Sequence, residues 1–340
     1  MSGWSRRAFL GAMAAGCSFA GARASAIGSD AAGTGGRGTT WLTATDVHVP
    51  GYPTVDAIRW MGEQLLERTG GRLGIRLYHS GQLGRESDAI DLARFGALDI
   101  ARVHMGSLNN PFPATRILSA PYVFQSTEHL RRSLDGEPGK RILAHFADRD
   151  LVGLAFYDSG ARNFYNTRHP IHAPGDLAGL KIRVPPSDLF MAMVRAIGAN
   201  PVPLPYGEVF SGLQTHLIDG AENNWMTFHT TRQFEEARHF ALTGHSYAPE
   251  ALLLSRRRHD ALAPGDRELL QALAIESVPR MRTAWDATEA ATRDKVVASG
   301  VAVTEVDRDA FARAAAPVVE QLIASDDGQR ELHRLIMDLA

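Results

Sequence analysis

The stretch LKIRVPPSDLFMAMVRAIG, residues 180–198, contains the elements that decide the fold. In residues 181–184 the apolar Ile182 and Val184 alternate with Lys181 and Arg183, and we expect a strand there. A helical pattern of apolar residues follows over 187–197, and Gly198 is placed to end that helix. A strand that leads through a short turn into a helix is the basic unit of an α/β protein, so this stretch predicts that fold class.

Arg183 lies inside this strand, between the apolar residues Ile182 and Val184. If Ile182 and Val184 face the core, Arg183 points to the opposite side, because side chains alternate along a strand. It then lies at the carboxyl end of a strand, where open α/β sheets bind ligands. The helix that starts near Ser187 adds unpaired N–H groups and a positive field. A guanidinium there grips a carboxylate through two parallel hydrogen bonds, although a structural Arg–Asp pair is the alternative.

The same alternation of strands and helices extends along the chain in both directions. Strand-type runs occupy 41–45, 73–77, 98–103, 151–157, 251–255 and 301–306, and helical patterns occupy 55–66, 88–95, 208–217 and 266–299. This order predicts an α/β architecture with largely parallel sheets. A length of 340 residues suggests about two domains. We therefore expect two α/β lobes that share crossing strands and one long helix, and we expect a kink at Pro279.

Two further arginines occupy positions like that of Arg183. Arg102 follows the strand-type residues 98–101, and a buried arginine at that point needs a partner. Arg162 comes shortly after the strand 151–157. Three arginines at three strand ends are what a cleft for an anionic solute requires.

Charge and cysteine content exclude several classes of function. The formal net charge is −2 and the longest basic run is Arg256–Arg258, so the sequence does not favour a nucleic-acid partner. The single cysteine, Cys17, lies in the N-terminal leader. The mature chain is therefore expected to have no disulfide, no thiolate metal site and no cysteine nucleophile.

The sequence offers little support for catalysis or for a cofactor. It contains no G-x-S-x-G, H-E-x-x-H or G-x-x-x-x-G-K-[ST] motif. His169 and His172 are three residues apart, but Pro170 breaks the helix that a metal pair would need. Four carboxylates are candidates for an acid/base pair, with helix caps or ion-pair partners as the alternative: Glu86, Asp158, Glu208 and Glu222. We therefore expect that the protein is not an enzyme and that it binds neither a cofactor nor a metal ion.

Residues 1–26 have the features of an export signal. The string Arg6-Arg7-Ala8-Phe9-Leu10 precedes a short run of small and apolar residues. The paired arginines resemble a twin-arginine signal, which predicts a periplasmic protein. A lipoprotein cut before Cys17 is the alternative.

Residues 27–40 have the composition of a flexible linker. Gly33, Gly35 and Gly38 fit G-x-G-x-x-G there, but a nucleotide-binding loop needs a strand before it and a helix after it. We therefore do not interpret these glycines as a phosphate site.

Over essentially all of 41–340 the chain resembles the TRAP-type (tripartite ATP-independent) periplasmic solute-binding proteins of the DctP family. Motifs in the same order carry the resemblance: Gly81–Gly84, Leu118–Phe124, Gly179–Pro185, Gly198–Val209, Gly212–Thr215 and Ile218–Asn224.

The resemblance implies two α/β lobes that close on a ligand cleft and are braced by a long hinge-spanning helix. Lobe I is expected over 41–161 plus about 250–289, and lobe II over 162–249 plus about 290–340. The implied partners are the small and large subunits of a membrane permease that is driven by an ion gradient, without an ATPase. The binding protein itself is expected to be a monomer.

A narrower likeness is to members that bind hexuronates such as glucuronate or galacturonate. Asp46–His48, Gly51–Val55, Ser159–Tyr165 and Glu222–Trp225 carry this likeness, while His104, Met105 and Met226 depart from it. By this likeness Arg183 clamps the solute carboxylate and Asn223 hydrogen-bonds the solute. The other implied site residues are His48, Glu86, Arg102, Arg162 and Ser187.

Several alternatives stay open at this point. The solute could instead be a C4-dicarboxylate, an aldonate or ectoine. The class could be a periplasmic enzyme acting on uronides, or a sensory or scaffolding protein with the same fold. Glu86 favours the hexuronate, because an ionised carboxylate in the cleft repels a second carboxylate and accepts hydrogen bonds from hydroxyls. The competing interpretation is that Glu86 only caps the helix that begins near Asp88.

Overall fold

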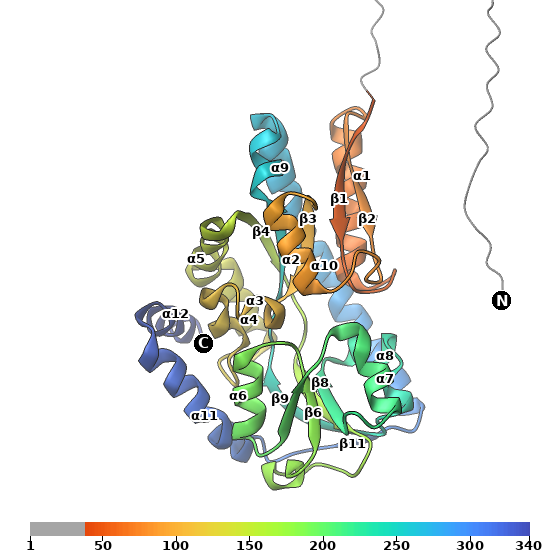
Figure 1. Cartoon of the computed structure of the whole chain (residues 1–340), viewed down its shortest axis with the longest axis vertical. Helices are drawn as coiled ribbons and strands as arrows, with labels where there is room; N and C mark the ends of the chain where they lie inside the picture. Colours follow the sequence, from red (N-terminus) through yellow and green to blue (C-terminus); the bar gives the residue numbers. More distant parts are fainter. Residues whose placement is uncertain (1–37) are drawn as a thin grey trace, which may run out of the picture. The chain divides into compact units, whose positions relative to one another are not determined.

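Two β-sheets organise residues 38–340, the part of the chain that this computed structural model describes (Figure 1). The first sheet has the order β2-β1-β3-β10-β4 and the second β11-β9-β5-β8-β6-β7. The strands are β1 (Thr40–Thr45), β2 (Leu73–Tyr78), β3 (Ile100–His104), β4 (Leu151–Tyr157), β5 (Arg162–Asn166), β6 (Lys181–Val184), β7 (Asn200–Pro203), β8 (Gly220–Asn223), β9 (His239–Ser246), β10 (Glu250–Ser255) and β11 (Ala302–Thr304).

The N-terminal predictions fall almost entirely outside the described residues. The export signal, Cys17 and residues 27–37 of the expected linker are among them. Thr40, which we expected in the linker, instead opens β1, because it pairs with Leu73 of β2.

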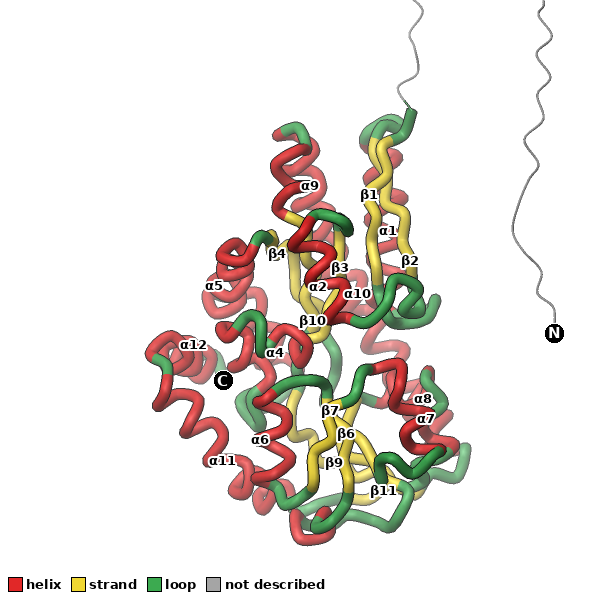
Figure 2. The backbone as a smooth tube through the Cα atoms, in the orientation of Figure 1, coloured by secondary structure: helices red, strands yellow, loops and turns green. Residues whose placement is uncertain are grey.

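Both sheets are largely parallel, as expected, and each contains one strand that runs against the others. Strand β10 runs antiparallel to β3 and β4, and β5 runs antiparallel to β8 and β9. The cause is the route of the chain, which crosses from one sheet to the other through residues 158–161 and back through 247–249 (Figure 2). A strand that follows such a crossing begins at the edge of the sheet where the neighbouring strands end. It is therefore antiparallel to them.

Helices cover the sheets and connect them. The helices are α1 (Pro53–Arg68), α2 (Glu86–Phe95), α3 (Met105–Leu108), α4 (Thr127–Asp135), α5 (Glu137–His145), α6 (Asp188–Ala196), α7 (Val209–Gln214), α8 (Trp225–Thr230), α9 (Arg256–Ala261), α10 (Pro264–Ala298), α11 (Arg308–Ser325) and α12 (Asp327–Met337). The long helix α10 packs against α1 and β4 beside the first sheet and against α8 beside the second. It runs through Pro279 as one helix and so ties both halves together.

The last two helices pack on different halves. Helix α11 packs against α6 and β9 of the second half, whereas α12 packs against α5 and the 3₁₀ helix Pro113–Ser119 of the first. The expected lobe boundary, which placed all of 290–340 in lobe II, stays a prediction.

Apolar faces with helical spacing hold α1 in place. Val55, Ile58, Met61 and Leu65 are fully buried and lie in one cluster with residues of α10 and of the first sheet. Burial of each such side chain contributes about 1.5–3 kcal/mol, so this stripe fixes the helix beside the strand end that carries Asp46.

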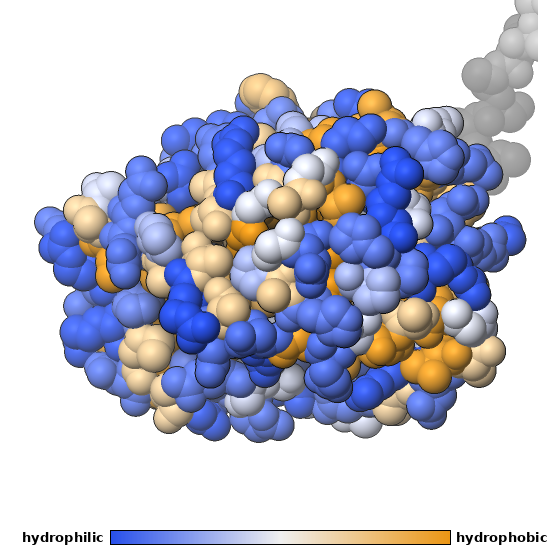
Figure 3. Space-filling model, turned by 90° about the horizontal axis from the view of Figure 1, so that it is seen from below, coloured by the Kyte–Doolittle hydropathy of each residue, from blue (hydrophilic) through white to orange (hydrophobic). Residues whose placement is uncertain are grey.

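No helix within 38–340 is long and apolar enough to cross a membrane. The face shown in Figure 3 is mostly hydrophilic, and its apolar side chains form separate small groups.

Candidate functional site

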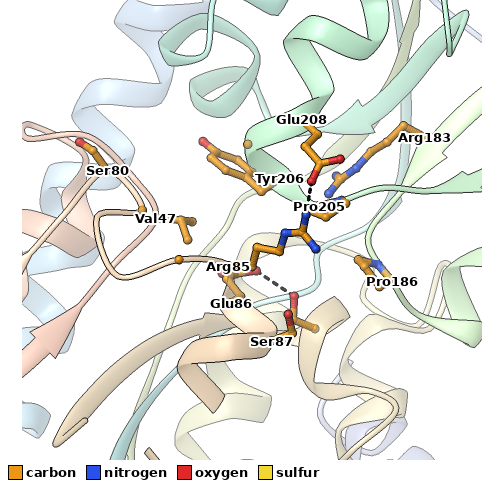
Figure 4. Close-up of a pocket in the computed structure, with 14 residues that line it drawn as sticks. Val47, Ser80, Arg85, Glu86, Ser87, Arg183, Pro186, Pro205, Tyr206 and Glu208 are labelled. Carbon is orange, nitrogen blue, oxygen red and sulfur yellow. Dashed lines mark hydrogen bonds and ion pairs between the residues drawn. The ribbon is translucent and has the colours of Figure 1, made fainter. Parts of the chain in front are cut away.

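The ends of strands from both sheets meet around a cleft. An outer cavity of about 500 Å³ lies at its mouth, with Val47 and Glu86 from the first half and Arg183 and Tyr206 from the second among its lining residues (Figure 4). The same four residues also line a smaller inner cavity, so the two cavities share part of their walls. Six of the seven predicted site residues line the inner cavity: His48, Glu86, Arg102, Arg162, Arg183 and Asn223.

Arg183 is held as the sequence pattern predicts. Ile182 and Val184 are buried in the core, and Arg183 points to the other side of β6 and lines both cavities. Its Nε donates to the carbonyl oxygen of Leu204 at 2.8 Å. No carboxylate within residues 38–340 forms an ion pair with it, and burial lowers its pKa. Arg183 is thus a buried cation that its own neighbours leave without a counterion.

Arg162, in contrast, is fully paired with a carboxylate. Its Nε donates to Oε2 of Glu222 at 2.6 Å and its Nη2 donates to Oε1 at 2.9 Å, a bidentate pair. Arg162 follows β4, as expected, and is itself the first residue of β5, whereas Arg102, expected at the carboxyl end of a strand, lies in the middle of β3. Burial by itself would raise the pKa of Glu222, but Arg162 and His245 more than offset this and the pKa lies below its usual value.

Arg102 is the centre of a second ion-pair cluster. Its Nη2 contacts Oδ1 of Asp46 at 2.5 Å, and its Nη1 lies 3.0 Å from Oε1 of Glu86 and 3.1 Å from Oε2 of Glu250. Burial would raise the pKa of Asp46, but the charges of Arg102 and His48 outweigh burial and lower it. This cluster fixes Arg102 at the wall of the inner cavity.

Glu86 positions its neighbours in addition to lining the cleft. It is the first residue of α2, and its oxygens accept hydrogen bonds from Nη1 of Arg102, the backbone N–H of His104 and the hydroxyl of Ser107. It therefore pairs with Arg102 while it remains at the wall of both cavities.

His48 and Asn223 present polar groups from opposite halves. The ring of His48 stacks on Tyr52 at 3.7 Å between centroids, and its Nδ1 lies 3.1 Å from the hydroxyl of Tyr206. The Oδ1 of Asn223 accepts from Arg162 and from the backbone N–H of Asn224. This orients the side-chain NH₂ of Asn223 as a donor, for which the described residues supply no acceptor.

Ser187 does not line either cavity. Its hydroxyl caps α6 by accepting from the backbone N–H of Phe190 and also accepts from the side chain of Asn109. A ligand contact by Ser187 stays a prediction.

The remaining acid/base candidates are structural partners. Asp158 pairs with Arg131 and Arg282, and Glu208 pairs with Arg85 across the cleft mouth at 2.7 Å. The side chains of Arg85 and Glu208 are 60% and 43% exposed, so their pair is weak. Figure 4 shows it bridging the opening.

Sequence reasoning missed several residues that line the inner cavity. Glu250 starts β10, whose register sets it beside His104 on one side and Tyr157 on the other. Nothing local in the sequence marks that position. His104, however, lies two residues after Arg102 on the same strand, so period-two alternation was a usable signal for it.

The comparisons with known proteins identify one protein family. Residues 45–326 match the model of the family described as bacterial extracellular solute-binding protein, family 7. A TRAP periplasmic solute-binding protein from Bradyrhizobium sp. BTAi1, solved with α/β-D-galacturonate, is 44% identical, with a TM-score of 0.86 over 88% of this chain and 100% of that one.

Two further relatives bind other sugar acids. A TRAP solute-binding protein from Roseobacter denitrificans, solved with β-D-glucuronate, is 38% identical, with a TM-score of 0.85 over 87% of this chain and 99% of that one. The 2,3-diketo-L-gulonate-binding periplasmic protein of Escherichia coli is 31% identical over 79% of this chain and 83% of its own length.

Proposed function

Because the chain belongs to family 7 of the bacterial extracellular solute-binding proteins, the receptors of TRAP transporters, we propose that its solute is a hexuronate such as D-galacturonate or D-glucuronate. Members of this family bind solutes and are not enzymes. The receptor holds the sugar acid in the cleft and delivers it to the small and large subunits of a membrane permease. We propose further that it acts in the periplasm as a monomer after export through a twin-arginine-type signal.

The observation that carries the hexuronate proposal is the unequal pairing of the three buried arginines. Arg102 and Arg162 each have carboxylate partners, whereas Arg183 has none within residues 38–340. A solute with one carboxylate supplies the missing counterion through a bidentate pair. Similar proteins solved with galacturonate or glucuronate support this choice.

A C4-dicarboxylate fits the charges of this cleft less well. The second carboxylate would need another guanidinium, and both others are already neutralised by four carboxylates: Asp46, Glu86, Glu222 and Glu250. Bringing in one more negative charge without a free cation is costly in a buried site. The hydroxyls of a sugar, in contrast, donate to these carboxylates and accept from Asn223.

A thermal-shift competition tests the proposal. Galacturonate or glucuronate at about one hundred times its dissociation constant adds about 2.7 kcal/mol of stability and raises the melting temperature by several degrees. Succinate and malate at the same concentration leave it unchanged. Stabilisation by the dicarboxylates and by neither uronate would refute the hexuronate assignment. Recovery of the sugar acid unchanged after incubation separates binding from turnover.

A further inference from the structure

His104 is placed to contact the ligand, although no motif in the sequence singles it out for that role. It is the last residue of β3, two positions after Arg102, and the intervening Val103 is buried in the core. Its ring is therefore on the cleft side of the strand, where it lines the inner cavity together with Arg162 and Arg183.

The two ring nitrogens of His104 have different partners. Nδ1 accepts the backbone N–H of Gly106 at 3.0 Å and so caps the short helix α3. Nε2 lies 3.1 Å from Nη1 of Arg162. A guanidinium offers only donors, and a neutral imidazole has one N–H and one lone pair. Because Nδ1 already uses the lone pair, Nε2 must carry the proton, and it faces a second donor.

Protonation of the ring does not relieve the contact between the two donors, His104 Nε2 and Arg162 Nη1. It would add an N–H at Nδ1 that faces the backbone N–H of Gly106. Burial, followed by the neighbouring charges of Arg162, Arg102 and Arg183, holds the pKa of His104 well below its usual value. The ring is therefore neutral at physiological pH, with one N–H donor.

The other N–H groups of Arg162 are engaged elsewhere. Nε and Nη2 are bonded to the side chain and backbone carbonyl of Glu222, and one N–H of Nη1 is bonded to Asn223. The second N–H of Nη1 remains, and it points towards His104. Two donors thus converge on one point of the cavity wall, and residues 38–340 supply no acceptor between them.

We propose that His104 and Arg162 form a two-donor pocket for an acceptor oxygen of the bound sugar acid, which makes His104 a specificity-determining residue. This inference rests on the proposed function. The pyranose ring oxygen suits the pocket best, because it offers two lone pairs and no hydrogen. In a hexuronate it is bonded to the same carbon as the carboxylate, so a carboxylate on Arg183 brings it close to this wall.

Two substitutions separate the roles of the two ring nitrogens. In His104→Asn, the amide oxygen takes the place of Nδ1 and keeps the cap on Gly106, but no donor reaches the position of Nε2. In His104→Gln, the longer amide restores a donor at the position of Nε2. Calorimetric titration with D-galacturonate is expected to show about a tenfold loss of affinity for the Asn variant and less than about a threefold loss for the Gln variant.

The melting temperature separates this effect from misfolding. The Asn variant is expected to keep the wild-type melting temperature, because the helix cap survives. Wild-type affinity in a stable Asn variant, or an equal loss in both variants, would overturn the role of His104. If the wild-type protein binds no uronate at all, the proposed function itself fails.

The tautomer of His104 provides a second, direct readout. Nitrogen NMR of the protein labelled with ¹⁵N-histidine is expected to show a protonated Nε2 and an unprotonated Nδ1 in the galacturonate complex. A ring protonated on Nδ1 in the complex would contradict the two-donor pocket.

Discussion

Replacing Arg183 with alanine is expected to weaken uronate binding by at least about thirtyfold. Loss of one member of a buried, hydrogen-bonded charge pair costs about 2–5 kcal/mol, and 1.4 kcal/mol corresponds to a factor of about ten. Arg183→Lys is expected to bind poorly as well, because an ammonium group cannot reproduce the two parallel hydrogen bonds of a guanidinium. Calorimetric titration with D-galacturonate measures both effects.

The stability of the Arg183→Ala protein distinguishes a ligand clamp from a structural arginine. Arg183 has one hydrogen bond to Leu204 and no carboxylate partner among the described residues, and burial disfavours its charge. Without ligand, the variant is therefore expected to be as stable as the wild type or slightly more stable. A less stable variant with unchanged affinity would show that Arg183 is structural.

Arg85→Ala is the matched control for this experiment. Arg85 is also an arginine at the cleft, but it is exposed and paired with Glu208 at the mouth. Exposed ion pairs contribute about 0–1 kcal/mol, so its removal is expected to change affinity by less than about fivefold.

Replacing Glu222 with alanine is expected to lower the free energy of unfolding by about 3–5 kcal/mol. The side chains of Glu222 and Arg162 are 0% and 2% exposed, and removal of the carboxylate leaves a buried guanidinium without its partner. Chemical denaturation measures the loss. Glu235→Ala, which breaks the exposed pair with Arg232, is the control and is expected to cost less than about 1 kcal/mol.

The same pair predicts a dependence of stability on pH. The folded protein holds the pKa of Glu222 below 4.5, its value in an unfolded chain, so the unfolded state binds more protons as the pH falls. The contribution of Glu222 is therefore fully present above its unfolded pKa and is lost as the pH falls through its folded pKa. Unfolding free energies of Glu222→Gln measured from about pH 6 down to about pH 3 are expected to fall less steeply than those of the wild type. Parallel curves would contradict the pairing.

Local sequence patterns were sufficient to predict those parts of the site that depend on one element. The strand that carries Arg183 and the helix that begins next to Ser187 appear where periodicity placed them. Arg183 also points away from the core, as Ile182 and Val184 required. These features depend on side chains only a few residues apart, whose relation is fixed by strand and helix geometry.

The partners of these residues depend on sheet topology, which local patterns do not contain. Strand β5 begins at Arg162 and pairs with β8, which brings Glu222 to that arginine across 60 residues of chain. Glu250 reaches Arg102 because β10 returns to the first sheet between β3 and β4. The sequence therefore located the arginines, but it could not predict which of them the fold would neutralise.

A crystal structure of the protein with D-galacturonate shows whether Arg183 holds the carboxylate of the solute. We expect both carboxylate oxygens about 2.7–2.9 Å from the guanidinium nitrogens of Arg183, with Arg102 and Arg162 still paired to their carboxylates. A carboxylate bound by Arg102, Arg162 or Arg85, with only hydroxyls facing Arg183, would show that Arg183 is not the carboxylate clamp.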